Sequence, residues 1–371
     1  MNLSFWERQT WLKSIDFAII GSGIVGLNCA LALREKYPKS KIGIFERGLL
    51  PSGASTKNAG FASYGSLSEI VEDLKTHSEE KVFNLVKDRV VGLQLLRKTI
   101  GDKSMDYQEH GGYELFLQED FELYETIIDK IEAINKFLHP IFKADVFSKK
   151  ANHFNFKNIQ PNLIFSRFEG QINTGKMMQS LIKKAVSKNI LVLNGAEIME
   201  ISDNINAVGL QVASDEEVIA KKVFIATNGF AKQFLAENIK PARAQVLITK
   251  PISNLKLKGT FHFDKGYYYF RNFENRVLFG GGRNLDFEAE ETTEMNLTST
   301  IQNRLETLLE TVILPDQEFE IEQRWSGIMG VGAQKIPIVK PISDNVFCGV
   351  RLGGIGIAIG STIGRQLAEF V

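Results

Sequence analysis

The chain has 371 residues, which is too long for one simple hydrophobic core and predicts two closely joined domains. Its 44% apolar and 24% charged residues are typical of a soluble globular protein. The 44 basic and 44 acidic side chains cancel, whereas phosphate binding leaves a basic excess. This neutral balance argues against nucleic acid as the main partner.

The two cysteines, Cys29 and Cys348, fall within apolar patterns and are expected to be buried as small hydrophobic residues. We expect no disulfide framework, and a reducing, cytoplasmic compartment fits. We read no signal peptide and no apolar run as long as a bilayer span, so no membrane segment is predicted. The histidines lack metal-ligand spacing, so we predict no metal site and expect each to be structural or exposed. They are His77, His110, His139, His153 and His262.

A glycine-rich turn follows the first apolar strand, residues 17–20, and precedes a helical pattern. Gly21 permits the tight strand-to-helix turn, Gly23 allows a pyrophosphate to approach the backbone, and Gly26 allows the helix to pack closely on the strand. The helix N-terminus offers unpaired N–H groups to the phosphates. Glu46 ends the second strand, where its carboxylate can accept ribose hydroxyls. Together these features predict a dinucleotide site.

A run of small residues, Gly53–Gly60, comes shortly after Glu46. The run alone is compatible with a flexible loop. Its position argues otherwise, because a chain that has just contacted the adenosine ribose returns along the diphosphate, where small side chains with hydroxyls or amides suit the contact. A second backbone approach beyond the acidic residue favours FAD over NAD.

The other elements are predicted from apolar periodicity and turn residues. In chain order they are a helix capped by Ser66 or Ser68 with a second part ending at Gly101, a strand over 113–117, a helix from Phe121 to about Leu138 ended by Pro140, a helix over 175–187, a strand over 190–193, a turn at Ser214-Asp215, a strand over 223–227, a hairpin over 267–279 turning near Glu274-Asn275, a helix over about 297–309, and a strand, glycine loop and helix after Ile336. This order predicts nucleotide-domain segments at the start, middle and end of the chain, with a second domain built from the insertions.

Several motifs together resemble the D-amino-acid oxidase/glycine oxidase/sarcosine oxidase superfamily. They are Gly53-Ala54-Ser55-x-x-Asn58-Ala59-Gly60, Arg324-Trp325-Ser326-Gly327, Pro337-Ile338-Val339 and the glycine-rich run from Val350 to Gly360. The resemblance covers essentially the whole chain and implies an α/β fold, with a Rossmann-like FAD-binding domain interleaved with a second α+β substrate domain on an antiparallel sheet. The expected bounds are 14–80, 165–235 and 335–371 for the FAD-binding domain, and 81–164 and 236–334 for the substrate domain.

The resemblance also implies noncovalent FAD, because Cys348 does not fall where the covalent-flavin cysteine of sarcosine oxidases is expected. The expected FAD contacts lie in separate segments of the chain. They are Gly21, Gly23, Ile24, Val25, Gly26, Glu46 and Arg47, then Ala54, Ser55, Asn58, Ala59, Gly60 and Phe61, then Thr227, Asn228 and Gly229, and finally Gly353, Gly354, Ile355, Gly356 and Ile357.

The expected substrate side begins with strand alternation, which puts Tyr267, Tyr269 and Arg271 on one face. In the family this hairpin carries an active-site tyrosine, and Tyr267 matches it best. An aromatic sheet face with satisfied hydroxyls is an equally open interpretation. The resemblance places Tyr64 at the substrate. Arg351 either binds substrate or is a surface or flavin-loop charge.

One position departs from the family pattern. Amino-acid oxidases of this family commonly carry an arginine shortly after the Trp-x-Gly motif, where this chain has Met329. A methionine cannot pair with a carboxylate. Either Arg271, Arg283 or Arg351 takes that role, or the substrate is an amine without an α-carboxylate, as in the γ-glutamylputrescine oxidase branch.

The resemblance therefore implies an FAD-dependent oxidoreductase that oxidises the C–N bond of a small amine or amino acid to an imine by hydride transfer, with oxygen or a carrier as electron acceptor. A 2-hydroxy-acid or glycerol-phosphate dehydrogenase on the same scaffold is one alternative, although it needs a general base that is usually histidine. A tRNA-modifying flavoprotein is another, against which the neutral charge counts.

Overall fold

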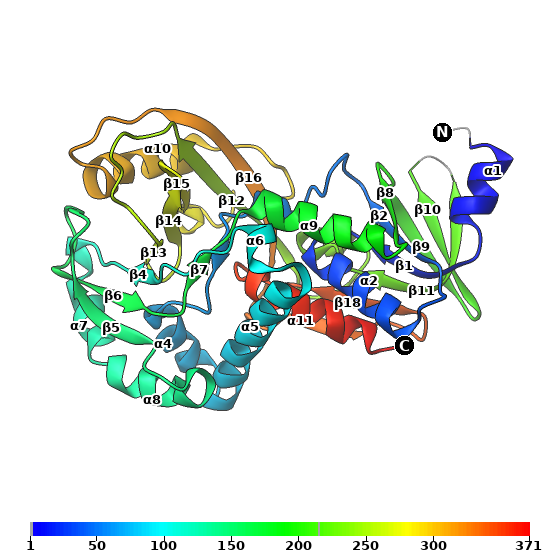
Figure 1. The fold of residues 1–371 in the computed structure, drawn as a ribbon, viewed down its shortest axis with the longest axis horizontal. Helices are drawn as coiled ribbons and strands as arrows, with labels where there is room; N and C mark the ends of the chain where they lie inside the picture. The colour runs from blue at the N-terminus through cyan, green and yellow to red at the C-terminus, as the bar shows by residue number, and fades with distance from the viewer. Residues whose placement is uncertain (1–2, 214–215) are drawn as a thin grey trace.

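The structure, a computed structural model, describes residues 3–213 and 216–371 and is built around two eight-stranded sheets (Figure 1). The turn expected at Ser214-Asp215 lies outside the described residues. One sheet occupies the lobe that contains both termini, and the other occupies the opposite lobe. Helices α5, Glu79–Ile100, and α9, Thr174–Ser187, run along the region where the two lobes meet.

The first sheet is a mostly parallel, Rossmann-like sheet. Its central strands follow the order β18-β11-β1-β2-β8, and every neighbouring pair among these five is parallel. Strand β17 pairs antiparallel with β18, and β9 and β10 form an antiparallel extension of β11. Bounds are β1 Ile15–Ile20, β2 Ile42–Glu46, β8 Leu191–Asn194, β9 Ile198–Asn204, β10 Ala207–Val212, β11 Glu217–Ile225, β17 Ile338–Pro341 and β18 Val346–Val350. Helices α2, Ile24–Lys36, and α11, Gly356–Ala368, pack side by side on this sheet.

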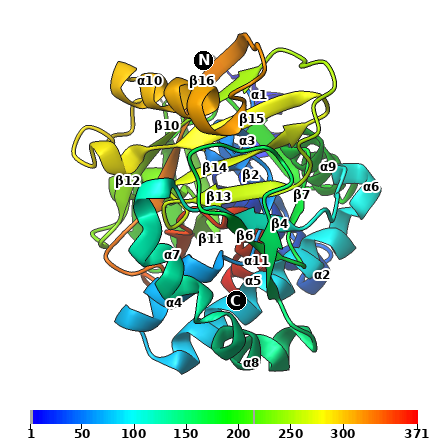
Figure 2. The same cartoon turned by 90° about the vertical axis from the view of Figure 1, so that its left-hand side faces the viewer.

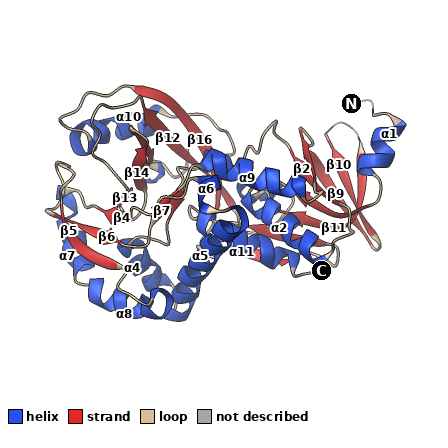
Figure 3. Ribbon diagram, in the orientation of Figure 1, coloured by secondary structure: helices blue, strands red, loops and turns tan. Residues whose placement is uncertain are grey.

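The second sheet has the order β16-β12-β15-β14-β13-β4-β6-β5, in which only the β13–β4 pair is parallel (Figures 2 and 3). Bounds are β4 Gly112–Glu114, β5 Phe147–Ala151, β6 Asn162–Ser166, β12 Lys240–Thr249, β13 Thr260–Phe263, β14 Tyr268–Phe273, β15 Arg276–Gly281 and β16 Ile321–Val331. One face of this sheet forms a phenylalanine-rich core under α10, Ser299–Leu308, in which the Phe261 and Phe270 rings stack with centroids 4.6 Å apart. The two sheets confirm the expected fold class.

Short elements connect the lobes and cover their edges. Strands β3, Phe61–Ala62, and β7, Gly170–Gln171, form a separate two-stranded sheet. The other helical elements are α1 Phe5–Glu7, η1 Arg8–Leu12, α3 Ala54–Lys57, α4 Leu67–Thr76, α6 Asp102–Met105, η2 Gln118–Asp120, α7 Phe121–Ile128, α8 Ile131–Phe142, η3 Asn228–Gln233, η4 Arg283–Leu285 and η5 Leu309–Ile313.

The helix expected from Phe121 to Leu138 is two helices, and that prediction was wrong. At the junction the Lys130 N–H donates to the Ile127 carbonyl, three residues back, which tightens the chain and ends α7. Pro140 lies inside α8 because it falls in the last turn, where a missing N–H removes only one hydrogen bond. The helix then ends at Phe142, before Lys143 adopts a left-handed backbone with φ of 57°.

Helix α5 belongs by packing to the lobe of the first sheet, although the expected bounds put residue 81 onward in the substrate domain. It packs against α11 at Gly92, where a Cβ atom would lie 2.2 Å from the Ala358 carbonyl oxygen. Only glycine allows the two helix backbones to approach this closely. The domain bounds themselves stay a prediction.

Candidate functional site

The glycine turn joins β1 to α2 with almost no free space. Gly21 has φ of 102°, and a Cβ atom on Gly26 would lie 2.0 Å from the Gly21 carbonyl oxygen. Gly23 is the N-cap of α2 and offers no capping side chain. The Ile24 N–H instead donates to the Ser55 hydroxyl over 2.9 Å. Ser55 therefore lies at the positive end of α2, where phosphates bind in other proteins.

Glu46 lies beside this turn, at the end of the neighbouring strand. Its carboxylate is buried and accepts hydrogen bonds from the Ser22 hydroxyl at 2.7 Å and the Ser52 hydroxyl at 2.9 Å. The next residue, Arg47, places its guanidinium 3.6 Å from the centre of the Phe230 ring. Our sequence analysis did not identify Ser22 or Ser52 as partners of Glu46, although both lie in the segments that it singled out.

The small-residue run is organised by Asn58. Its amide donates to the carbonyls of Ala54 and Ser55, and its Oδ1 accepts from the Gly60 N–H and the Thr174 hydroxyl, each over 2.9 Å. Gly60 has φ of 78°, and a Cβ atom there would lie 2.4 Å from the Ile172 carbonyl oxygen. The run is therefore a fixed loop and not a flexible one.

The last two expected segments follow β11 and β18. The Asn228 Oδ1 accepts from the Leu352 N–H over 3.1 Å, and the Gly353 N–H donates to the Gly330 carbonyl over 2.9 Å. The Thr227 hydroxyl is buried without a hydrogen-bond partner. Helix α11 begins at Gly356 without a side-chain cap, so its N-terminal N–H groups are available to a ligand.

These segments meet at the carboxyl ends of the parallel strands β1, β2, β11 and β18, where ligands bind in open α/β sheets. The residues present fit FAD. The uncapped N-termini of α2 and α11 suit negative charge, the Glu46 carboxylate suits ribose hydroxyls, and the unpartnered Thr227 hydroxyl supplies a buried polar group. The individual contacts stay predictions.

The expected substrate residues on β14 are only partly brought together. Tyr269 and Arg271 lie in the strand and share its face, whereas Tyr267 lies in the turn before it, with its ring 5.8 Å from the Phe287 ring. Tyr64 is buried in the helical core with its ring 5.4 Å from Phe142. Burial raises the pKa of Tyr64 to about 12, so its hydroxyl stays protonated.

An aromatic cluster, Phe61, Tyr269 and Trp325, connects the small-residue loop to the second sheet. The Phe61 and Tyr269 ring centroids are 5.6 Å apart, and the Trp325 indole N–H donates to the Lys57 carbonyl over 2.9 Å. Met329 lies further along the Trp325 strand, with its sulfur 4.0 Å from the ideal Cβ position of Gly354. This face of β14 and β16 thus meets both loops expected to contact flavin.

Arg271 and Arg351 both bind backbone carbonyls. Arg271 donates to the carbonyls of Ala59, Ile172 and Asn272, and burial lowers its pKa to about 10. It thereby ties the small-residue loop to the second sheet. Arg351, with φ of 64°, donates to the carbonyls of Ile336 and Asn238. Both guanidinium groups are occupied within the protein.

The sequence analysis did not single out His262, which lies buried beside the aromatic cluster. It pairs across strands with Tyr269, its ring lies 5.1 Å from Phe61, and its Nε2 is 2.9 Å from the Glu169 carboxylate. Burial favours the neutral imidazole, but Glu169 outweighs it and raises the pKa of His262 to about 9. The alternation Thr260-Phe261-His262-Phe263 was the available signal, since it puts His262 on the polar face of the sheet.

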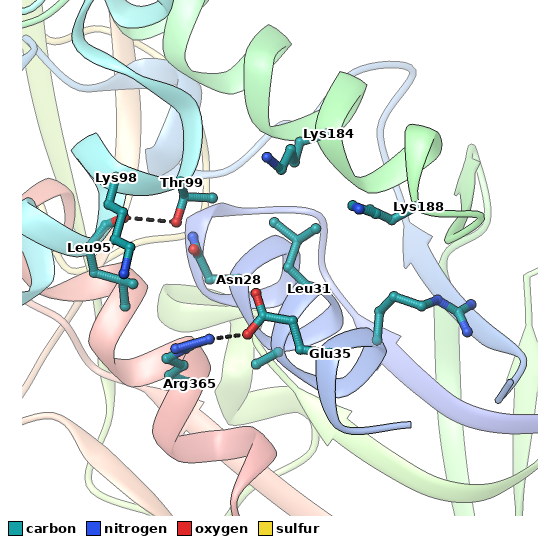
Figure 4. Close-up of a pocket in the computed structure, with 11 residues that line it drawn as sticks. Asn28, Leu31, Glu35, Leu95, Lys98, Thr99, Lys184, Lys188 and Arg365 are labelled. Carbon is teal, nitrogen blue, oxygen red and sulfur yellow. Dashed lines mark hydrogen bonds and ion pairs between the residues drawn. The ribbon is translucent and has the colours of Figure 1, made fainter. Parts of the chain in front are cut away.

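A separate pocket of about 400 Å³ lies among α2, α5, α9 and α11 (Figure 4). Lys98, Lys184 and Lys188 surround it and lie at the C-terminal ends of α5 and α9. Cations are favoured at helix C-termini because the terminal carbonyls carry negative partial charge. The helix ends therefore account for this cluster of charges.

Two searches of the described residues, 3–213 and 216–371, found nothing. No group of three or more His, Cys, Asp or Glu side chains there is placed to hold a metal ion. None of the helices in the same ranges combines the length and the apolar character that crossing a membrane requires.

Comparison with known proteins agrees with this site. The chain matches the DAO family, described as FAD dependent oxidoreductase, over residues 16–370. It is 20% identical to the probable oxidoreductase OrdL of Haemophilus influenzae over 98% of this chain and 84% of that protein. Its fold is similar to glycine oxidase from Geobacillus kaustophilus, with a TM-score of 0.77, 19% identity and coverage of 96% and 94% of the two chains. L-proline dehydrogenase from P. horikoshii gives 0.76, 16%, 96% and 93%.

The family match spans nearly the whole chain and includes every segment of the site described above. Neither cysteine is exposed, since Cys29 is buried in α2 and Cys348 in β18. The chain belongs to the DAO family of FAD-dependent oxidoreductases, and it is an enzyme whose cofactor is noncovalently bound FAD.

Proposed function

We propose that this enzyme oxidises the C–N bond of an amine or amino acid to an imine. FAD accepts a hydride when bound, so the carbon that bears the nitrogen gives up one hydrogen with two electrons. The nitrogen then loses a proton to water, which leaves a C=N double bond that water hydrolyses. The amine must be uncharged before the hydride leaves.

The protonation states beside Phe61 carry this proposal. Burial raises the pKa of Tyr269 to about 12, and Glu169 raises that of His262 to about 9 against the effect of burial. Both groups are therefore protonated at neutral pH and neither accepts a proton from the substrate. A neutral amine needs no such base, and an apolar aromatic site favours the neutral amine by desolvation.

Oxidation of a 2-hydroxy acid is the second candidate, and the position of His262 favours it. An alcohol keeps its hydroxyl proton at neutral pH, so its oxidation needs a general base, usually histidine. His262 is close to the aromatic cluster, but its contact with Glu169 holds the imidazole in the charged form. A charged imidazole donates protons and does not accept them, which favours amine oxidation.

The named activities of structural relatives support the amine class. The comparison includes a glycine oxidase, an L-proline dehydrogenase and an iminodiacetate oxidase from Chelativorans sp. BNC1. Each name describes an oxidation of a compound that contains a C–N bond. We expect the protein to work in the cytoplasm on a small molecule, with oxygen or a carrier reoxidising the flavin.

An anaerobic flavin-bleaching screen tests the proposal. The purified holoenzyme is mixed with amino acids, N-methyl amino acids, polyamine derivatives and 2-hydroxy acids, and the flavin absorbance is followed. We expect at least one amine to bleach the flavin band and to yield a carbonyl product after hydrolysis. Bleaching by hydroxy acids alone would assign the second function, and purified protein without flavin would contradict both.

A further inference from the structure

The arginines of the second sheet differ in how their guanidinium groups are satisfied. Arg243 pairs with the buried Glu290 over 2.8 Å, Arg276 pairs with Glu322, and Arg271 binds three carbonyls. Arg283 is different. Within residues 3–213 and 216–371, its side chain forms no ion pair or hydrogen bond.

Two aromatic rings hold Arg283 in place. Its guanidinium carbon lies 5.5 Å from the centre of the Tyr267 ring and 5.0 Å from the centre of the Phe287 ring. Packing of a guanidinium over rings leaves its N–H donors free for a planar anion, because those donors point outward in the plane of the group. Arg283 is also close enough to Tyr269 to lower the pKa of that hydroxyl, although burial dominates and raises it.

The sheet register places Arg283 at the expected substrate face. Strand β15 ends at Gly281, which is opposite Gln245, and Gln245 is opposite Ser326 on the other side. Arg283 follows Gly282, which has φ of 77° and turns the chain out of the strand. Arg283 is therefore level with the stretch of β16 that continues to Met329, with only β12 between the two strands.

We propose that Arg283 binds a carboxylate of the substrate, so that the enzyme prefers amines that carry a carboxylate. This inference rests on the proposed amine oxidation. A carboxylate can accept two parallel N–H bonds from one guanidinium, which fixes its orientation as well as its charge. Met329 offers no such bond, and Arg271 and Arg351 already donate to backbone carbonyls.

The test compares matched ligands on the holoenzyme and its variants. Proline and pyrrolidine differ only in the carboxylate, and benzoate is a carboxylate that cannot reduce flavin. Dissociation constants come from anaerobic flavin reduction for the amines and from perturbation of the flavin spectrum for benzoate. The variants are Arg283→Met, which removes the charge, Arg283→Lys, which retains it, and Arg276→Met, an exposed ion-paired control in the same hairpin.

We expect Arg283→Met to weaken benzoate and proline binding by about 10- to 100-fold and to leave pyrrolidine binding within about 2-fold, because a hydrogen bond to a charged group contributes about 1.5–3 kcal/mol. Arg283→Lys should lose less, and Arg276→Met should bind as wild type does. Equal binding of benzoate by wild type and Arg283→Met, at matched melting temperatures, would overturn the inference. Failure of every amine to bleach wild-type flavin while benzoate binding still depends on Arg283 would contradict the proposed function alone.

Discussion

At the scale of single residues, the space around each glycine separates those that shape the cofactor turn from those that do not. A Cβ atom on Gly26 would lie 2.0 Å from the Gly21 carbonyl oxygen, whereas one on Gly53 meets nothing within 4 Å. We expect Gly26→Ala to lower the free energy of unfolding by about 1–3 kcal/mol and to weaken FAD binding, because helix and strand must separate.

Gly53→Ala is the matched control, because Gly53 has an ordinary negative φ of −83°. Fluorescence titration of apoprotein with FAD and urea unfolding of both variants measure the two effects. Equal FAD affinity in Gly26→Ala and Gly53→Ala would show that the turn tolerates a side chain.

The buried pair of His262 and Glu169 predicts a pH-dependent stability. Glu169 raises the folded pKa of His262 to about 9, above the unfolded value of about 6.5. The stabilisation is complete below about pH 6.5 and is lost as pH rises through about 9, because the folded state binds the extra proton only in that window. We expect the free energy of unfolding to fall by about 2–3 kcal/mol across it.

Glu169→Gln should abolish this dependence and cost about 3–5 kcal/mol at pH 7, because burial without a partner disfavours the imidazolium. Glu322→Gln removes an exposed partner of Arg276 and should cost at most about 1 kcal/mol. Urea unfolding at pH 6 and pH 9 distinguishes the two variants, and a pH slope that persists in Glu169→Gln would assign it to another group.

At the scale of elements, Gly92 fixes helix α5 against α11. A Cβ atom there would lie 2.2 Å from the Ala358 carbonyl oxygen and 2.7 Å from the Thr362 hydroxyl. We expect Gly92→Ala to lower the unfolding free energy by about 1–3 kcal/mol despite the better helix propensity of alanine.

The control for Gly92 is Gly175→Ala, because Gly175 lies in the first turn of α9 and its Cβ atom would be at an ordinary 3.4 Å from the Asn173 side chain. Thermal unfolding should show this variant at or above the wild-type melting temperature. If both variants melt alike, the close approach of α5 to α11 is not rigid.

Element prediction succeeded where a cap and a long apolar period agreed. The Asn173 cap and the periodicity that follows it predicted α9 to within one residue. The region of α7 and α8 was predicted as one helix because its apolar spacing continues through residues 121–138. The break there comes from a local change of hydrogen bonding at Lys130, which side-chain spacing does not report.

At the scale of the whole molecule, FAD is expected to stabilise the fold, because its expected contacts come from the carboxyl ends of four strands and from the small-residue loop. Arg271 ties that loop to the second sheet. A ligand that binds only the folded state stabilises it by about 4 kcal/mol at a thousand times its dissociation constant. We therefore expect apoprotein to melt well below holoprotein in scanning calorimetry.

Reconstitution of the apoprotein with FAD should restore the melting temperature, and adenosine diphosphate, which lacks the flavin, should restore only part of it. Identical melting of apoprotein and holoprotein would contradict the expected contacts. Two separate transitions in the apoprotein, merging into one with FAD, would show that the cofactor couples the lobes.

The sequence by itself determined the cofactor class and the interleaved order of segments, because glycine turns, caps and acidic strand ends are local features with local causes. Only the tertiary structure decided which charged groups are occupied. Arg271 and Arg351 bind carbonyls far away in sequence, His262 contacts Glu169, and Arg283 stays available over two rings. Such pairings depend on strands from distant parts of the chain meeting in one sheet, and periodicity in one segment carries no information about them.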